Sequence, residues 1–115
     1  MRIALIGYGK MGKSIEAIGK SRGHEISFII DQNNQDEINS ISPDNTDIAI
    51  EFSQPDSAYN NIITLLTNGV KTVAGTTGWL DKYDEVVKLC NDKNGTFLYA
   101  SNFSIGVNLF FELNE

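Results

Sequence analysis

The residues best suited to chemistry in this 115-residue chain begin with a glycine-rich segment, Gly7-Tyr8-Gly9-Lys10-Met11-Gly12. Between a strand and a helix, this GxGxxG spacing allows a tight turn, the approach of a diphosphate to the backbone, and close packing of the helix. The free N–H groups that begin a helix favour an anion by about 0.3–1 kcal/mol. Lys10 adds a positive charge. The spacing therefore predicts a site for the diphosphate of a dinucleotide, and the alternative is a plain strand-to-helix turn.

An acidic residue follows at the distance expected for the same kind of site. Asp31 lies about 20 residues beyond the glycine segment, at the end of the second apolar run. A carboxylate there accepts hydrogen bonds from ribose hydroxyls and repels a 2′-phosphate, and Gln32-Asn33-Asn34 contains no Arg or Lys to receive one. We therefore expect NAD(H) to be favoured, with NADP(H) as the alternative. The structural alternative is that Asp31 only begins a turn.

Two more segments follow predicted strands. Gly75-Thr76-Thr77-Gly78 combines backbone freedom with two hydroxyl groups, which suits a flat amide or a sugar held close to the main chain. Phe52, followed by Ser53, ends the third apolar run. The Phe52 ring is as well suited to contact a nicotinamide as to complete the core.

The elements that must position these residues alternate along the chain. Apolar runs predict strands at 3–6, 26–30, 47–52, 70–74 and 96–99. Helical periodicity predicts helices at 10–22, after the capping-box pattern Ser53-Gln54-Pro55-Asp56, and around 83–94. The connection 32–45 has too few apolar residues for a full helix. The order βαββαβαβ indicates an α/β, Rossmann-like, doubly wound parallel sheet, in which ligands bind at the carboxyl ends of the strands.

Composition excludes other classes of function. Nine Lys and Arg residues against 15 Asp and Glu residues give a net charge of −6, so we expect no nucleic-acid partner. The apolar runs are too short for a membrane span or a signal peptide. His24 and Cys90 cannot form a structural zinc site, and neither is a catalytic candidate. A reducing, cytoplasmic location fits the single cysteine.

Together the motifs resemble the dihydrodipicolinate reductase (4-hydroxy-tetrahydrodipicolinate reductase) family over all 115 residues. The resemblance rests on the glycine segment, on Glu51-Phe52-Ser53-Gln54-Pro55, on Gly75-Thr76-Thr77-Gly78, and above all on Ser101-Asn102-Phe103-Ser104-Ile105-Gly106-Val107-Asn108. It implies an oxidoreductase of lysine and diaminopimelate biosynthesis, in which NADH or NADPH reduces a cyclic, unsaturated dicarboxylate.

The resemblance also implies roles for residues. The glycine segment would hold the pyrophosphate, Asp31 the adenosine ribose, 75–77 the nicotinamide side, and 100–103 would lead toward the substrate. Many members have an extra residue in the glycine loop and Arg in place of Lys10, whose ammonium lacks the planar fork of a guanidinium. The predicted cofactor-binding residues are Gly7, Tyr8, Gly9, Lys10, Met11, Gly12, Asp31, Phe52, Ser53, Gly75, Thr76, Thr77, Ala100, Ser101, Asn102 and Phe103.

The resemblance also implies that the family's His-His motif, catalytic Lys and Ser-Gly-Thr segment belong to a following substrate domain, and residues 1–115 contain none of them. We therefore expect residues 1–104 to form a dinucleotide-binding domain and 105–115 to begin an interdomain helix. Such a fragment would be inactive alone and monomeric, whereas the complete enzyme would be a homotetramer. One alternative is a stand-alone NAD(H)-sensing module that docks a partner through its C-terminal apolar helix. Another is the cofactor domain of a dehydrogenase acting on aspartate or a sugar.

Overall fold

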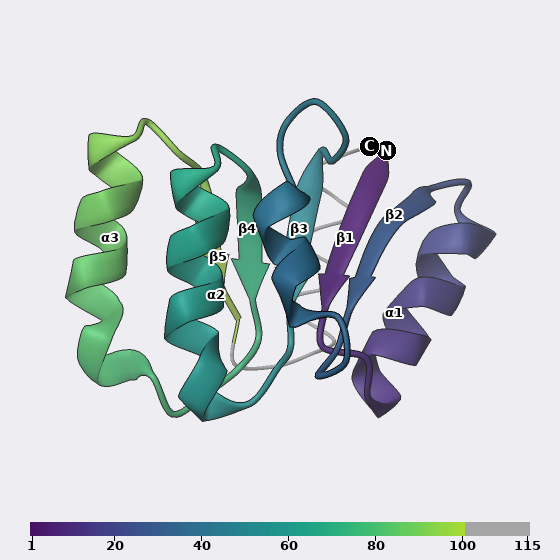
Figure 1. Cartoon of the computed structure of the whole chain (residues 1–115), viewed down its shortest axis with the longest axis horizontal. Helices are drawn as coiled ribbons and strands as arrows, with labels where there is room; N and C mark the ends of the chain where they lie inside the picture. Colours follow the sequence, from purple (N-terminus) through teal and green to yellow (C-terminus); the bar gives the residue numbers. More distant parts are fainter. Residues whose placement is uncertain (101–115) are drawn as a thin grey trace.

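The computed structural model describes residues 1–100 and contains a five-stranded sheet (Figure 1). Its strand order is β2-β1-β3-β4-β5, and every neighbouring pair is parallel. Parallel strands need crossover connections, and these place helices over the faces of the sheet. The strands are β1 (Arg2–Ile6), β2 (Glu25–Ile30), β3 (Ile48–Glu51), β4 (Lys71–Ala74) and β5 (Phe97–Tyr99).

Three α-helices and two short 3₁₀ segments connect the strands, in the order that the sequence predicts. The connection between β2 and β3 contains only a 3₁₀ segment, as expected from its few apolar residues. The predicted doubly wound α/β sheet is therefore confirmed. The connecting elements are α1 (Lys10–Ser21), η1 (Gln35–Ser40), α2 (Pro55–Thr67), η2 (Leu80–Lys82) and α3 (Tyr83–Asp92).

The core lies on both faces of the central strand β1. Ile3 and Leu5 pack on one face with Ile15 of α1, whereas Ala4 and Ile6 face the side of η1 and α2. All four of these β1 residues are at most 1% exposed. Complete burial of an Ile or Leu side chain contributes about 1.5–3 kcal/mol, so this strand anchors the turn that follows it.

The helix ends agree only in part with the sequence motifs. Gly23 follows α1 with a φ of +83°, the left-handed conformation expected of a helix terminator. The predicted capping box before α2 is wrong, since Gln54 is the N-cap and no side chain caps the helix. The hydroxyl of Ser53 instead donates a hydrogen bond to the Glu51 carboxylate.

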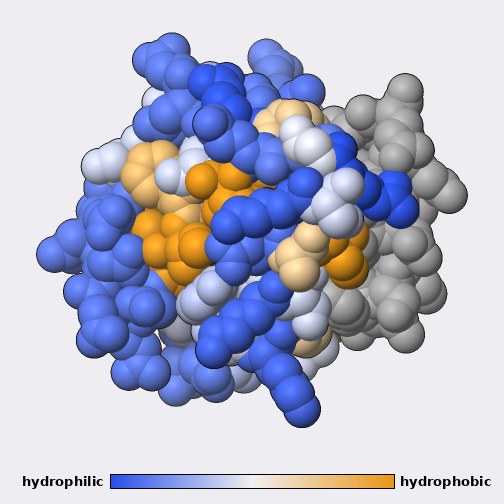
Figure 2. All heavy atoms as spheres, turned by 90° about the vertical axis from the view of Figure 1, so that its right-hand side faces the viewer, coloured by the Kyte–Doolittle hydropathy of each residue, from blue (hydrophilic) through white to orange (hydrophobic). Residues whose placement is uncertain are grey.

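The surface around β2 and α1 faces the viewer in Figure 2, where hydrophobic areas lie between larger hydrophilic ones. Because β2 is an edge strand, most of its side chains are only half-buried. Across residues 1–100, no helix has the length and apolar character needed to cross a membrane. Cys90 is buried on α3, as expected of a small apolar residue.

An ion pair joins the start of β1 to the segment before β3, and it gives stability a dependence on pH. The Arg2 guanidinium lies 2.8 Å from Asp47 and, by donating hydrogen bonds, lowers the pKa of that carboxyl from 3.8 to about 2. The stabilisation from this ion pair is therefore present above about pH 4 and is lost as the pH falls through the folded-state pKa of Asp47, about 2. Because both side chains are more than a third exposed, solvent reduces it to about 1 kcal/mol.

We expect Asp47→Asn to lower the free energy of unfolding by about 1 kcal/mol at pH 7 and by much less at pH 2.5. Urea unfolding at the two pH values measures this. Asp44→Asn is the matched control, because Asp44 accepts a hydrogen bond from Arg2 only through its backbone carbonyl. A loss from Asp47→Asn of the same size at both pH values would contradict the assignment.

Candidate functional site

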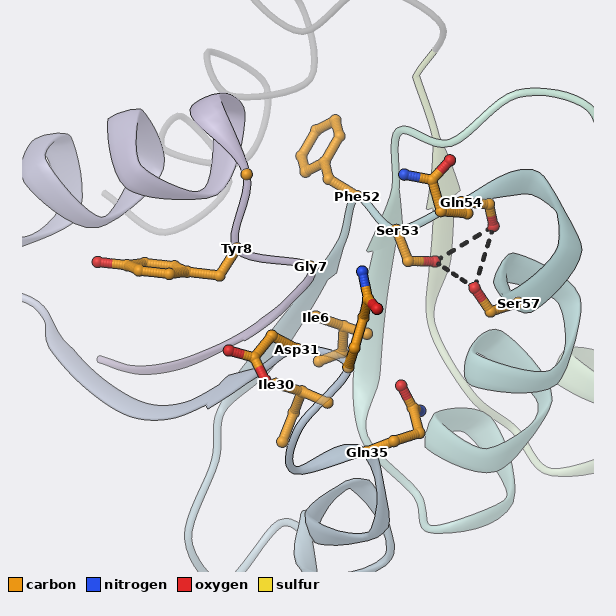
Figure 3. Close-up of a pocket in the computed structure, with 12 residues that line it drawn as sticks. Ile6, Gly7, Tyr8, Ile30, Asp31, Gln35, Phe52, Ser53, Gln54 and Ser57 are labelled. Carbon is orange, nitrogen blue, oxygen red and sulfur yellow. Dashed lines mark hydrogen bonds between the residues drawn. The ribbon is translucent and has the colours of Figure 1, made fainter.

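A cavity of about 310 Å³ lies at the carboxyl ends of β1, β2 and β3. Strands β2 and β3 lie on opposite sides of β1, so the order in which strands are added to the sheet switches sides between β1 and β3. Open parallel sheets bind ligands at such a switch point. The cavity is lined by Ile6, Gly7, Tyr8, Gly9, Ile30, Asp31, Gln32, Gln35, Phe52, Ser53, Gln54 and Ser57 (Figure 3).

The three glycines of the GxGxxG segment meet different surroundings. Gly7 has a φ of +103°, and a Cβ there would lie 2.2 Å from the Phe52 carbonyl oxygen. A Cβ on Gly12 would lie 2.5 Å from the Gly7 carbonyl oxygen. A Cβ on Gly9 would meet nothing within 4 Å. Gly7 and Gly12 therefore permit the turn itself, whereas Gly9 leaves open space at the cavity.

The start of α1 is suited to an anion. Gly9 is the N-cap, no side chain caps the helix, and the first turn contains no acidic residue. The first N–H groups of a helix have no acceptor within it and carry a partial positive charge. Lys10 is exposed at the first helical position, where its ammonium adds to that charge.

Tyr8 lies at the margin of the cavity and is held by α1. Its hydroxyl donates a 2.6 Å hydrogen bond to Glu16, and this bond raises the pKa of Tyr8. The Lys13 ammonium lies 5.6 Å from the centre of the ring. A neutral hydroxyl bound to a carboxylate is a poor general base, so the structure favours a positioning role for Tyr8 over proton transfer.

Asp31 follows β2 and is exposed to solvent at the cavity. Its Oδ1 accepts a 2.8 Å hydrogen bond from the backbone N–H of Asn33, and its own N–H donates to the Asn34 side chain at 2.7 Å. Asp31 therefore begins a turn and also presents its carboxylate to the cavity. In Figure 3, Tyr8 and Asp31 lie across the cavity from Ser53, Gln54 and Ser57.

Phe52 stands between this cavity and a second one. The second cavity, of about 210 Å³, extends to the segment after β4 and to the first turn of α1. Phe52 lines both cavities and also packs against the core, so the two roles considered for it are compatible. A Cβ on Gly75 would lie 1.7 Å from the Phe52 ring, which therefore occupies the space above Gly75. The second cavity is lined by Met11, Phe52, Ser53, Pro55, Gly75, Thr76 and Thr77.

A buried carboxylate connects the segments behind the two cavities. Glu51 ends β3 and is 0% exposed. Its Oε1 accepts a 2.7 Å hydrogen bond from the Thr76 hydroxyl. Its Oε2 accepts bonds from the N–H and hydroxyl of Ser53 and, at 3.3 Å, from the Asn61 amide. Glu51 is not among the site residues predicted from the sequence, although an acid that ends an otherwise apolar strand is a signal for such a residue.

The same network distinguishes the two predicted threonines. The Thr76 hydroxyl donates its proton to the Glu51 carboxylate, whereas Thr77 is exposed at the second cavity. The Trp79 indole N–H donates a 2.5 Å bond to the Thr76 carbonyl, which helps to fix this loop. The reason is burial: a threonine that is 7% exposed must satisfy its hydroxyl within the protein.

Several polar residues that the sequence did not indicate also reach the first cavity. The Gln35 amide donates a 2.9 Å hydrogen bond to the Asn61 side chain, which in turn donates to the Ser53 hydroxyl at 3.1 Å. These partners lie far apart along the chain, so no local motif marks them. The additional lining residues are Gln32, Gln35, Gln54 and Ser57.

The structure brings most of the predicted site residues to one edge of the sheet. Ala100 is buried, and its N–H bonds to the Ala74 carbonyl at 3.0 Å, which extends the pairing of β5 with β4. The predicted residues Ser101, Asn102 and Phe103, and the helix expected at 105–115, lie outside the described residues. Cofactor binding by these residues remains a prediction.

Comparison with known proteins adds to this geometry. Residues 1–103 match the family model described as "Dihydrodipicolinate reductase, N-terminus". The chain belongs to this family. A relative named 4-hydroxy-tetrahydrodipicolinate reductase, from Christiangramia forsetii, is 46% identical over 115 residues, or 100% of this chain and 47% of the relative. A relative of the same name from Bifidobacterium animalis subsp. lactis is 33% identical over 114 residues, and the match covers 91% of this chain and 44% of the relative. This dihydrodipicolinate reductase family chain thus spans about half the length of the curated relatives it matches.

Solved structures resemble the family domain in fold. A hyperthermophilic archaeal homoserine dehydrogenase in complex with NADPH aligns with a TM-score of 0.68 and 17% identity, over 87% of this chain and 43% of the other. An aspartate dehydrogenase from Thermotoga maritima also gives a TM-score of 0.68, with 16% identity over 89% and 46% of the two chains. At such low identity these similarities establish only the Rossmann-like fold.

Proposed function

We propose that this chain binds NADH, as the cofactor-binding part of a 4-hydroxy-tetrahydrodipicolinate reductase. The observation that carries the proposal is the cavity at the switch point, where the open start of α1 at Gly9 and the carboxylate of Asp31 both line the wall. An anion acceptor and a hydrogen-bond acceptor for sugar hydroxyls are the two groups that a dinucleotide requires. The open space at Gly9 fits the approach of a diphosphate.

The residues of the site have distinct proposed roles. The N–H groups at Gly9 and Lys10 would hold the diphosphate, and Asp31 would accept hydrogen bonds from the adenosine ribose. Phe52 and Thr77 would bound the space for the nicotinamide end in the second cavity. A reduced nicotinamide bound there supplies a hydride. The apolar ring of Phe52 would exclude water from that side of the site.

We further propose that the whole protein reduces 4-hydroxy-tetrahydrodipicolinate to tetrahydrodipicolinate with loss of water, in lysine and diaminopimelate biosynthesis. The names of the relatives and the family match support this reaction. The titratable side chains that line the two cavities, within residues 1–100, are those of Tyr8 and Asp31. Neither suits a proton donor or a clamp for a dicarboxylate, so we propose that residues beyond this described part supply both functions.

Isothermal titration calorimetry of the chain with NADH and NADPH tests the binding proposal. We expect saturable binding with one site, and tighter binding of NADH. ADP-ribose, which lacks the nicotinamide, separates binding at the adenosine and diphosphate end from binding at the nicotinamide end. If neither dinucleotide binds, the proposed function is wrong.

We expect Asp31→Ala to weaken NADH binding by roughly ten- to a hundredfold, because a hydrogen bond to a charged group contributes about 1.5–3 kcal/mol. NADPH binding should weaken much less, because the substitution also removes the repulsion of the 2′-phosphate. Asp36→Ala is the control, since Asp36 is an exposed acid of η1 that does not line the cavity. Equal losses for the two dinucleotides would contradict the assigned role of Asp31.

A further inference from the structure

The buried carboxylate of Glu51 lies directly behind the site. The next two residues, Phe52 and Ser53, line both cavities, and Thr76, which bonds to Glu51, lines the second. The groups bonded to Glu51 are the Ser53 N–H, the Ser53 hydroxyl, the Asn61 amide and the Thr76 hydroxyl, and each of them donates. The two N–H groups must donate, and the two hydroxyls can donate as well, so an ionised carboxylate, which only accepts hydrogen bonds, satisfies all four contacts.

No cation neutralises this charge by direct contact within the described residues. The ion pairs between residues of 1–100 are Arg2–Asp47 and Lys20–Glu16, and neither includes Glu51. Buried charges are normally paired, because removal from water is costly. A charge that solvent does not reach also acts over a longer distance, since the effective dielectric constant of the interior is far below that of water.

We propose that Glu51 makes the nicotinamide end of the site favour the oxidised, positively charged dinucleotide over the reduced, neutral one. The inference rests on the proposed binding of NAD(H). The two forms share their adenosine, ribose and diphosphate groups, and they differ in the positive charge of the oxidised ring. A fixed negative charge near that ring therefore stabilises the bound oxidised form relative to the bound reduced form. The same charge would assist hydride donation, because positive charge develops on the ring as the hydride leaves.

Glu51→Gln separates this electrostatic role from a structural one. An amide has nearly the shape of a carboxylate, and its oxygen can accept the bonds from Ser53 and Asn61. The Thr76 hydroxyl can reverse and accept a hydrogen bond from the new amide group. The substitution therefore removes the charge and leaves the connection between the ends of β3 and β4 in place. A purely structural role of Glu51 would change the affinities for both forms equally.

The test measures the dissociation constants of NAD⁺, NADH and ADP-ribose by calorimetry. We expect Glu51→Gln to weaken NAD⁺ binding by roughly three- to tenfold, from a charge interaction at an effective dielectric constant near 20. NADH and ADP-ribose should change by less than about twofold. A tenfold change in the NAD⁺ to NADH ratio corresponds to about 30 mV for this two-electron couple.

Asp56→Asn is the matched control. It removes the same unit charge from an exposed residue in the first turn of α2, where solvent screens the carboxylate. We expect it to leave the NAD⁺ to NADH ratio unchanged. Equal weakening of both forms by Glu51→Gln, or an equal change of the ratio by Asp56→Asn, would overturn the inference. Failure of the unaltered chain to bind NADH would instead contradict the proposed function on which the inference rests.

If Glu51→Gln does not fold, ¹³C NMR of the unaltered chain tests the premise of the inference, which is that Glu51 carries a negative charge. The side-chain carboxyl carbon of Glu51 has different chemical shifts when ionised and when protonated. We expect the ionised form at pH 7, and a protonated carboxyl at that pH would overturn the inference.

Discussion

Gly9→Ala is expected to weaken NADH binding by roughly ten- to a hundredfold while leaving the stability of the fold almost unchanged. The position has an extended backbone, with φ −85° and ψ −155°, which alanine adopts without strain. A Cβ there would meet no protein atom within 4 Å, so the free energy of unfolding should change by less than about 0.5 kcal/mol. The added methyl group would instead occupy space that the diphosphate needs beside the first N–H groups of α1.

Calorimetric titration and thermal unfolding measure the two effects separately. Gly19→Ala is the control in the same helix, because a Cβ at Gly19 would make ordinary contacts of 3.5 Å and 3.7 Å with Ile3 and Ile26. That control should retain NADH binding. An unaltered NADH affinity in Gly9→Ala would show that the diphosphate does not lie at the start of α1.

Gly7→Ala is expected to have the opposite result, a loss of roughly 3–5 kcal/mol in stability, enough to unfold many small domains. Its φ of +103° excludes alanine from a relaxed conformation, and a Cβ would lie 2.2 Å from the Phe52 carbonyl oxygen. That oxygen belongs to the backbone at the end of β3, so it cannot move away as a flexible side chain could. The turn after β1 and the end of β3 must therefore separate.

Gly23→Ala separates the cost of a positive φ from the cost of the contact with the Phe52 carbonyl. Gly23 also has a positive φ, of +83°, but a Cβ there would meet nothing within 4 Å. Its substitution should cost only the conformational strain of about 1–2 kcal/mol. Urea unfolding of both variants measures the difference. A loss in Gly7→Ala no larger than in Gly23→Ala would mean that the contact with Phe52 adds nothing.

The two predictions show why one motif contains residues with different functions. Spacing alone places Gly7, Gly9 and Gly12 in a single pattern. The structure shows that Gly7 and Gly12 are required by the protein's own backbone, whereas the space beside Gly9 is open. Within this one motif, Gly7 and Gly12 therefore support the fold, whereas Gly9 supports the proposed binding site.

Much of the fold was predictable because its causes are local. The apolar run of β1 is buried on both faces, and Ile15 of α1 and the apolar stripe of α2 are buried as their spacing indicates, although Met11 at the start of α1 is 42% exposed. The capping box before α2 was wrong for a reason that is not local. Ser53 has the right residue type for a cap, but a buried carboxylate two residues earlier takes its hydroxyl.

By itself, the sequence determined the order of strands and helices, the glycine turn, and the positions of Asp31 and Phe52 at strand ends. These features follow from periodicity, chain direction and the freedom of glycine, which act between near neighbours. Only the tertiary structure decided that Glu51 is buried, that it has no cationic partner among residues 1–100, and that it is bonded to Thr76, 25 residues away. The contact of Gln35 with Asn61 and the placement of the Phe52 ring above Gly75 were decided in the same way. The physical reason is that burial and hydrogen-bond partners depend on which segments the sheet brings together, and residue type alone does not specify them.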